Sequence, residues 1–229
     1  MLNNTTTIMS KILLAYLTII IVIASVSLID NTMLLNFQQQ QQQQEAIAQS
    51  TTTTNNNMTI SPFQSSTATT RNFLTYTNSN YGITIQYPSD WKIGEHIYTN
   101  RFVVNFTSTL KNNSDTFPAT ITVSVEPLKQ NRTTLNEFTI TTLDNAKQSL
   151  PNLQLIESNA TTLASNPAHR IVYTFTSSDP SVQLHFQSMN IWTLKENKVY
   201  SISYTQARSQ FNKYLPIIQN MIHSFDIIK

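Results

Sequence analysis

Hydrophobic and polar positions divide the chain into three parts. An apolar run of eighteen residues without a charge covers residues 12–29. Residues 30–70 follow; they are rich in Gln, Thr and Asn and have almost no apolar periodicity. From 71 to 229 the pattern becomes regular, and this length suits one domain with a proper core. We therefore predict a short N-terminus at 1–11, an apolar segment, a linker and one folded domain.

The apolar run is near the minimum length for a helix that crosses about 30 Å of hydrocarbon. A cleaved signal peptide has a shorter apolar region, of about 7 to 15 residues, with a small-residue cleavage site close behind it. Small residues here lie inside the run, at 25–27, or well beyond it, at 46–48. We expect an uncleaved transmembrane anchor, with secretion after signal cleavage as the alternative. Lys11 is the only charge before the run, which favours a cytoplasmic N-terminus and a folded domain outside the cell membrane.

The segment at 30–70 contains seven consecutive glutamines at 38–44. It cannot bury enough apolar surface to offset the entropy of ordering, so we expect a disordered, low-complexity linker. A flexible tether of about forty residues has a root-mean-square reach of roughly 35 Å. Such a linker would hold the folded domain close to the membrane without fixing its orientation.

Period-two alternation in the third part predicts strands. Pro88 cannot donate a ladder hydrogen bond and is expected to end the second of them, with Trp91 plugging the core after a turn. Residues 195–198 predict a tight hairpin turn. The predicted strands cover 73–77, 82–87, 101–107, 119–126, 168–177, 182–194 and 198–206.

Helical spacing of apolar residues predicts two helices. The first covers about 134–150, with Thr133 or Thr134 as its N-cap. The second covers about 209–223, and Pro216 inside it is expected to kink it or to start its last part. Long antiparallel strands with helices between and after them predict an α+β domain, with a central antiparallel sheet and helices packed on it.

Charge and composition exclude several classes of function. Charged residues make up 11 % of the chain, the net charge is +2, and the basic residues are scattered singly. A nucleic-acid-binding protein concentrates its basic residues in a patch, so we expect no nucleic-acid partner. The chain has no cysteine, which excludes disulfides, thiolate zinc sites and cysteine nucleophiles.

No motif in the chain has the pattern of a catalytic or cofactor site. Ser89 and Lys92 match S-x-x-K formally, but no Lys-Thr-Gly element accompanies them, so the stretch is interpreted as a turn. The only glycines are Gly82 and Gly94, too few for a phosphate loop. The histidines lie in different predicted elements, which argues against a histidine metal site: His96, His169, His185 and His223.

Asn-x-Ser/Thr sequons mark potential glycosylation sites on an exported chain, although several would arise by chance in a sequence this rich in Asn and Thr. On the C-terminal side of the apolar segment they are Asn57, Asn105, Asn112, Asn131 and Asn159.

Two stretches resemble the PsbP-like domain family. Residues 73–93 are similar to the opening of these domains, with the pattern "N..YGI.I.YP..W", and residues 201–227 are similar to their last strand and C-terminal helix. The resemblance covers roughly 73–228. The residues that carry it, for which we predict structural roles, are Tyr81, Gly82, Tyr87, Pro88, Trp91, Tyr204, Tyr214, Met221 and Phe225.

The resemblance implies an α-β-α sandwich around an antiparallel sheet. Photosynthetic members of this family are extrinsic subunits that support a calcium-dependent membrane complex, and this analogy is the only pointer to a cofactor, calcium. Other members are exported proteins of unassigned role, including archaeal ones. The anchor and linker make this chain similar to that exported, archaeal type. Fold alone does not carry the photosystem role over.

We expect a non-catalytic, membrane-tethered module that binds or helps to assemble a membrane or envelope protein complex. An exposed apolar patch would favour this function. Tyr98, Phe102 and Tyr214 are candidates for it, although a core or core-rim position is the better fit for each. The alternatives are an envelope hydrolase, which needs paired carboxylates or a serine–base pair in one cleft, and a carrier of a small ligand or metal.

Overall fold

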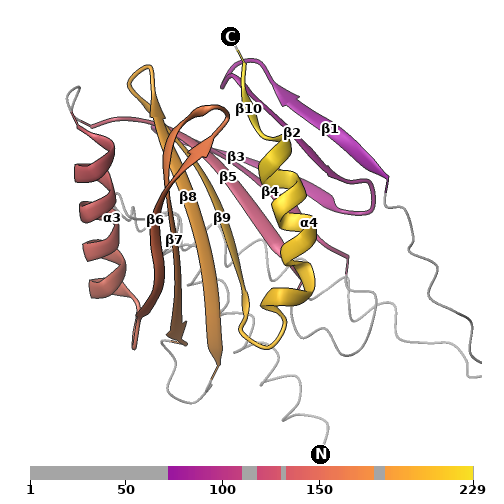
Figure 1. Cartoon of the computed structure of the whole chain (residues 1–229). Coiled ribbons are helices and arrows are strands. Elements are labelled where there is room, and N and C mark those ends of the chain that lie inside the picture. Colours follow the sequence, from indigo (N-terminus) through magenta and orange to yellow (C-terminus); the bar gives the residue numbers. More distant parts are fainter. Residues whose placement is uncertain (1–71, 110–117, 130–132, 178–183, 229) are drawn as a thin grey trace, which may run out of the picture. The chain divides into compact units, whose positions relative to one another are not determined.

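The computed structural model describes residues 72–109, 118–129, 133–177 and 184–228 (Figure 1). These residues form ten strands and two helices. In chain order they are β1 (Phe73–Asn78), β2 (Ile83–Pro88), β3 (Lys92–Tyr98), β4 (Arg101–Thr107), β5 (Thr120–Pro127), α3 (Leu135–Ser149), β6 (Gln154–Leu163), β7 (Asn166–Thr176), β8 (His185–Lys195), β9 (Lys198–Ala207), α4 (Phe211–Ser224) and β10 (Asp226–Ile227).

The strands form two antiparallel sheets. The large sheet has the order β3-β4-β5-β9-β8-β7-β6, so β3 and β6 are its edge strands. The small sheet has the order β1-β2-β10. Antiparallel sheets with two helices confirm the predicted α+β class.

The large sheet buries both of its faces, because its central strands carry apolar residues at successive positions. On β9, Tyr200, Ile202 and Tyr204 belong to a core shared with α4 and the small sheet. Val199 and Ala207 point the opposite way, into a second core shared with α3. Figure 1 shows this arrangement, with α3 on one side of the large sheet and α4 with β1 and β2 on the other.

Helix α3 begins with a capping box. The side chain of Thr134 accepts a hydrogen bond from the backbone N–H of Glu137, and the Glu137 carboxylate accepts one from the Thr134 N–H. These reciprocal bonds satisfy two helix-end donors. The bond from the Thr134 N–H, and next one from the Thr134 hydroxyl, lowers the pKa of the Glu137 carboxyl. Thr134 is thus the N-cap, one of the two residues that the sequence offered for that position.

Most predicted elements match the structure within one to three residues, but three short or exposed strands were not predicted. They are β3, β6 and β10. Strand β6 has only one buried residue, and β3 has none. Edge strands bury little surface, so they lack the alternation by which buried strands are recognised. Helix α4 continues through Pro216.

The predicted anchor at 12–29 and linker at 30–70 lie outside the described residues. Within the part of the chain that the structure describes, no helix is long and apolar enough to cross a membrane.

Gly82, in the turn before β2, has a positive φ of 67°. A Cβ atom at this position would lie 2.8 Å from the carbonyl oxygen of Ile228. That segment is held close because the Ile228 N–H donates to the Gly82 carbonyl oxygen at 3.0 Å. The position therefore requires glycine for both its dihedral angle and its close backbone contact.

We expect Gly82→Ala to lower the free energy of unfolding by about 1–3 kcal/mol, the usual cost of a left-handed conformation for a residue other than glycine. Thermal and denaturant unfolding of the full chain in detergent, followed by circular dichroism, measures this loss. Gly94→Ala is the matched control, because a Cβ there meets only the His96 Nε2 atom, at 3.7 Å. Equal losses for the two variants would contradict this account of Gly82.

Candidate functional site

Three large apolar side chains are exposed on β1 and β3, the strands that end their respective sheets. Ile97 is 73 % exposed, Leu74 48 % and Ile93 40 %. Exposed apolar residues that gather in one place are typical of interaction surfaces, whereas single ones are common. The residues packed around these three side chains therefore show whether the three belong to one surface.

Aromatic rings beneath these side chains connect them. On the large sheet, Ile93 is paired with Phe106 of β4. The ring of Tyr87 contacts that of Phe106, with centroids 5.1 Å apart, and Tyr87 is paired with Leu74 of β1. Leu74 and Ile93 are thus each paired with one ring of a contacting pair, although they belong to different sheets.

A hydrogen bond joins the two sheets beside these rings. The Tyr76 hydroxyl donates to Oε1 of Glu95 at 2.6 Å. Burial, and next this hydrogen bond, raise the pKa of Tyr76 to about 12, so the phenol stays protonated. Farther along β3, Ile97 is paired with Phe102, on which the Tyr81 ring stacks at 4.1 Å. We call Leu74, Ile93, Glu95 and Ile97 the β1–β3 edge surface.

The other face of β3 carries polar and basic groups. Lys92, Gly94, His96 and Tyr98 alternate with the residues of the edge surface. The His96 ring stacks on Tyr98, with centroids 6.2 Å apart, and the Arg101 guanidinium lies 5.9 Å from the Tyr98 ring centre. Burial raises the pKa of Tyr98, and the Arg101 charge partly opposes that shift.

The three aromatic candidates for an apolar patch occupy the core or core-rim positions that the sequence favoured for them. Phe102 and Tyr214 are buried in the core, and Tyr98 is half-buried. The aromatic residues support the surface from below, and the aliphatic residues of β1 and β3 are exposed above them. The sequence signal available for this surface was a pair of isoleucines, four residues apart and directly before the strand at 101–107. Gly94 and Glu95 lie between them and interrupt the apolar alternation that would have predicted a strand.

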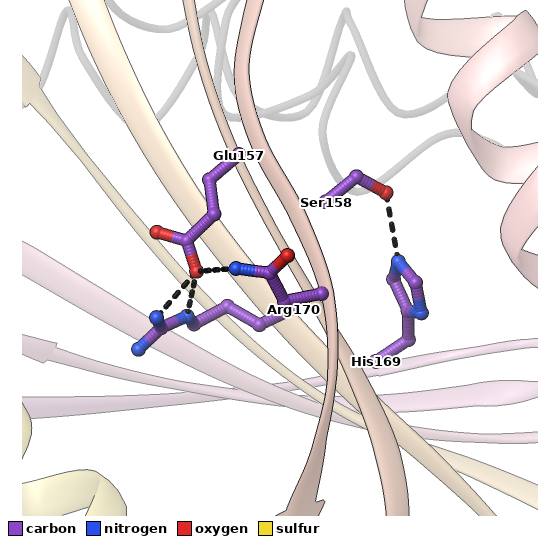
Figure 2. A network of polar contacts seen from close by, with 5 residues as sticks. Glu157, Ser158, His169 and Arg170 are labelled. Atoms are coloured by element: carbon purple, nitrogen blue, oxygen red, sulfur yellow. Dashed lines mark hydrogen bonds and ion pairs between the residues drawn. The ribbon is translucent and has the colours of Figure 1, made fainter.

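A second group of polar contacts lies on β6 and β7 (Figure 2). The Arg170 guanidinium forms an ion pair with Oε1 of Glu157, which also accepts a hydrogen bond from Asn159 at 2.9 Å. Ser158 Oγ lies 2.8 Å from Nε2 of His169. Figure 2 shows the two pairs on opposite sides of the ladder, as successive residues of a strand require.

The contact between Ser158 and His169 resembles the serine–base pair of a hydrolase site. A serine nucleophile also needs a group that orients its histidine and donors for the oxyanion. The nearest carboxylate in sequence, Glu157, points to the other face of the sheet and is paired with Arg170. His169 instead stacks on Trp192, with centroids 6.0 Å apart, and Ser158 is exposed. Glu157 is therefore not positioned to orient His169 as the third member of a triad.

The described residues offer no fit for calcium or another metal. Within them, no three His, Asp or Glu side chains converge. Several carboxylates already have other partners, such as Glu126 with Arg101 and Asp144 with Lys147. Oxygen-rich coordination by six to eight ligands is what calcium requires, so no role for the metal follows from these residues.

The sequons lie in different settings. Asn159 is exposed on β6, whereas Asn105 is half-buried on β4, where its Oδ1 accepts a hydrogen bond from Thr122 at 2.7 Å. Asn57, Asn112 and Asn131 lie outside the described residues. Glycosylation remains a prediction for all five.

The residues that carry the family pattern lie mainly in the core beside the small sheet and α4. Trp91 is buried, with its ring centre 6.4 Å from that of Tyr214. The Tyr204 hydroxyl donates to the Phe211 carbonyl oxygen at 2.9 Å. Pro88, Met221 and Phe225 are buried, and Tyr81, Gly82 and Tyr87 are half-buried.

The sequence matches the family model described as PsbP-like protein over residues 13–227. No curated protein matched the chain in a sequence comparison. Among solved structures, cyanobacterial PsbP from Synechocystis is similar at 15 % identity and a TM-score of 0.51, covering 73 % of this chain and 99 % of its own. The Ran-binding protein Mog1p of Saccharomyces cerevisiae is similar at 10 % identity and a TM-score of 0.49, covering 70 % and 97 %.

We expect His169 in the folded protein to titrate below 6.5, because burial against Trp192 disfavours the imidazolium. The unfolded chain then binds the proton more readily, so the stability that neutral His169 contributes is present above pH 6.5 and is lost as pH falls below it. NMR titration of the imidazole in the full chain measures this pKa.

Ser158→Ala is the control for that titration. Burial, and not the serine, causes the shift, so the pKa should stay below 6.5 in this variant. A pKa above 6.5 in the unmodified protein would contradict this account, because burial alone lowers the pKa of a histidine.

Proposed function

This chain belongs to the PsbP-like protein family, and we propose that it is a non-catalytic, membrane-tethered module that binds a protein partner at the outer surface of the cell membrane. Binding would assist the assembly of a membrane or envelope protein complex. The family match covers residues 13–227, and so includes nearly all of the apolar segment at 12–29 and of the folded domain at 71–229. This supports treating the two as parts of one functional unit.

The proposed tether determines where such a partner would be found. An anchor at 12–29 and a flexible linker at 30–70 would keep the domain within a few tens of ångströms of the membrane. A domain held at that distance meets membrane proteins at a high effective concentration, so even a modest binding surface would be sufficient.

The observation that carries the proposal is the β1–β3 edge surface. Leu74, Ile93 and Ile97 expose apolar side chains over buried aromatic rings, beside a strand that ends its sheet. An exposed, apolar edge strand is a liability for a monomeric protein unless a partner covers it. The polar pairs of β6 and β7 provide no comparable support for an enzymatic function.

We expect the double variant Ile93→Ser/Ile97→Ser to recover about tenfold less of the partner than the unmodified chain, because it removes most of the exposed apolar surface of β3. The measurement is quantitative mass spectrometry of cross-linked, tagged full-length protein purified from its native membranes. A chain that keeps 1–70 and lacks the folded domain defines the background.

Leu155→Ser/Ile156→Ser is the matched control, because it makes two equivalent changes at the opposite edge, where both residues are also exposed. It should recover the partner at the unmodified level. Equal recovery with both double variants, or none above background with any chain, would overturn the proposal.

A further inference from the structure

Strand β3 has an open backbone edge as well as exposed side chains. It pairs with β4 without a register shift, from Lys92 with Thr107 to Tyr98 with Arg101. In an antiparallel pair, alternate residues direct their N–H and C=O groups away from the partner strand. Within the described residues no other strand pairs with β3, because it stands at the end of the sheet order. One alternate set of its backbone groups is therefore available for another strand.

The opposite edge of the sheet is less regular. Strand β6 has a register shift between Leu155 and Glu157, which interrupts its regular hydrogen-bonding edge at that end of the strand. Glu157 is also held in the ion pair with Arg170. Bulges and charges are the usual means by which an edge strand avoids a neighbour. Strand β3 carries the charged residues Lys92 and Glu95 but has no register shift.

The side chains of β3 define what that neighbour would carry. Ile93, Glu95 and Ile97 share the face of the small sheet, and on this face a complementary strand has the order apolar, basic, apolar. Lys92 and His96 lie on the other face, where acidic residues of a neighbouring strand would be complementary in charge. A Cβ at Gly94 would have only His96 Nε2 near it, at 3.7 Å, so this face has room for a neighbour's side chains.

A second copy of the chain does not meet these requirements. Two β3 strands related by a two-fold axis can pair Ile93 of each with Ile97 of the other only when the axis passes through Glu95. That register places the two Glu95 carboxylates directly opposite each other, and like charges in that position are destabilising. Registers centred on Ile93 or Ile97 keep only one apolar pair.

We propose that β3 is completed by an extended strand of the partner protein, with the pattern apolar–acidic–basic–acidic–apolar centred opposite Glu95. This inference rests on the proposed function and specifies its binding mode. Backbone hydrogen bonds to the open edge would supply affinity, and the Glu95 carboxylate would select the basic residue, as in other recognition by strand addition.

The test uses synthetic peptides and the full-length protein in detergent micelles. The probe has the core Val-Asp-Lys-Asp-Val, and the comparison peptide has glutamate in place of the central lysine. Fluorescence anisotropy should show that the lysine peptide binds about tenfold more tightly, because an opposite-charge pair replaces a like-charge pair. Hydrogen exchange should slow at alternate amides of β3 only when the lysine peptide is bound.

Two variants examine the role of Glu95. Glu95→Lys should reverse the preference between the peptides, and Glu95→Gln, which can still accept the Tyr76 hydrogen bond, should abolish it. Methylating the peptide backbone at alternate nitrogens should remove binding, whereas Leu155→Ser/Ile156→Ser should not change it.

Failure of this inference can be distinguished from failure of the proposed function. If no peptide binds, or if the methylated peptide binds equally well, strand addition is wrong. The proposed function would still stand if Ile93→Ser/Ile97→Ser reduced the recovery of the partner from membranes, because the β1–β3 edge surface would then bind the partner in another way. The inference would also be overturned if the protein self-associated in micelles and Ile93→Ser/Ile97→Ser abolished that self-association. Such a result would assign the β3 edge to a second copy of the chain.

Discussion

The aromatic contact between the small sheet and β4 is the interaction on which the rest of this domain depends. Rings of Tyr76 and Tyr87 pack against Phe106, and Tyr81 stacks on Phe102. This contact fixes β1 and β2 over one face of the large sheet and leaves β3 at its border. Aromatic pairs add stabilisation beyond their buried area and also restrict geometry. The same rings that close the core therefore position the exposed aliphatic residues above them.

Sequence patterns predicted the central strands well, because those strands are buried on both faces or alternate regularly. Strands β4 and β9 and the hairpin between β8 and β9 show this, and Glu196 and Asn197 at that hairpin have the positive φ values of a tight turn. Strands β3 and β6 could not be predicted in the same way. Their residues face solvent, and tertiary pairing with β4 and β7 makes them strands.

The position of the candidate site could not be predicted from the sequence. An exposed apolar patch was named only as a feature that would favour a binding function. Phe102 and Tyr214 are buried, as a core position requires, and the exposed positions belong to Ile93 and Ile97 on a strand that no periodicity revealed. The contact between Ser158 and His169 was equally invisible, because it depends on the register of two neighbouring strands. Fold and family are readable from the sequence, whereas surfaces made by neighbouring strands require the structure.

Site-specific photo-cross-linking in native membranes tests the central claim most directly. A photoreactive amino acid at Ile97 is compared with the same residue at Ile156, a similarly exposed isoleucine on the opposite edge strand. The account predicts one dominant cross-linked protein from Ile97, with its attachment in an extended segment of that protein, and none from Ile156. Equal cross-linking from both positions, or cross-linking from Ile156 alone, would contradict the assignment of the β1–β3 edge as the binding surface.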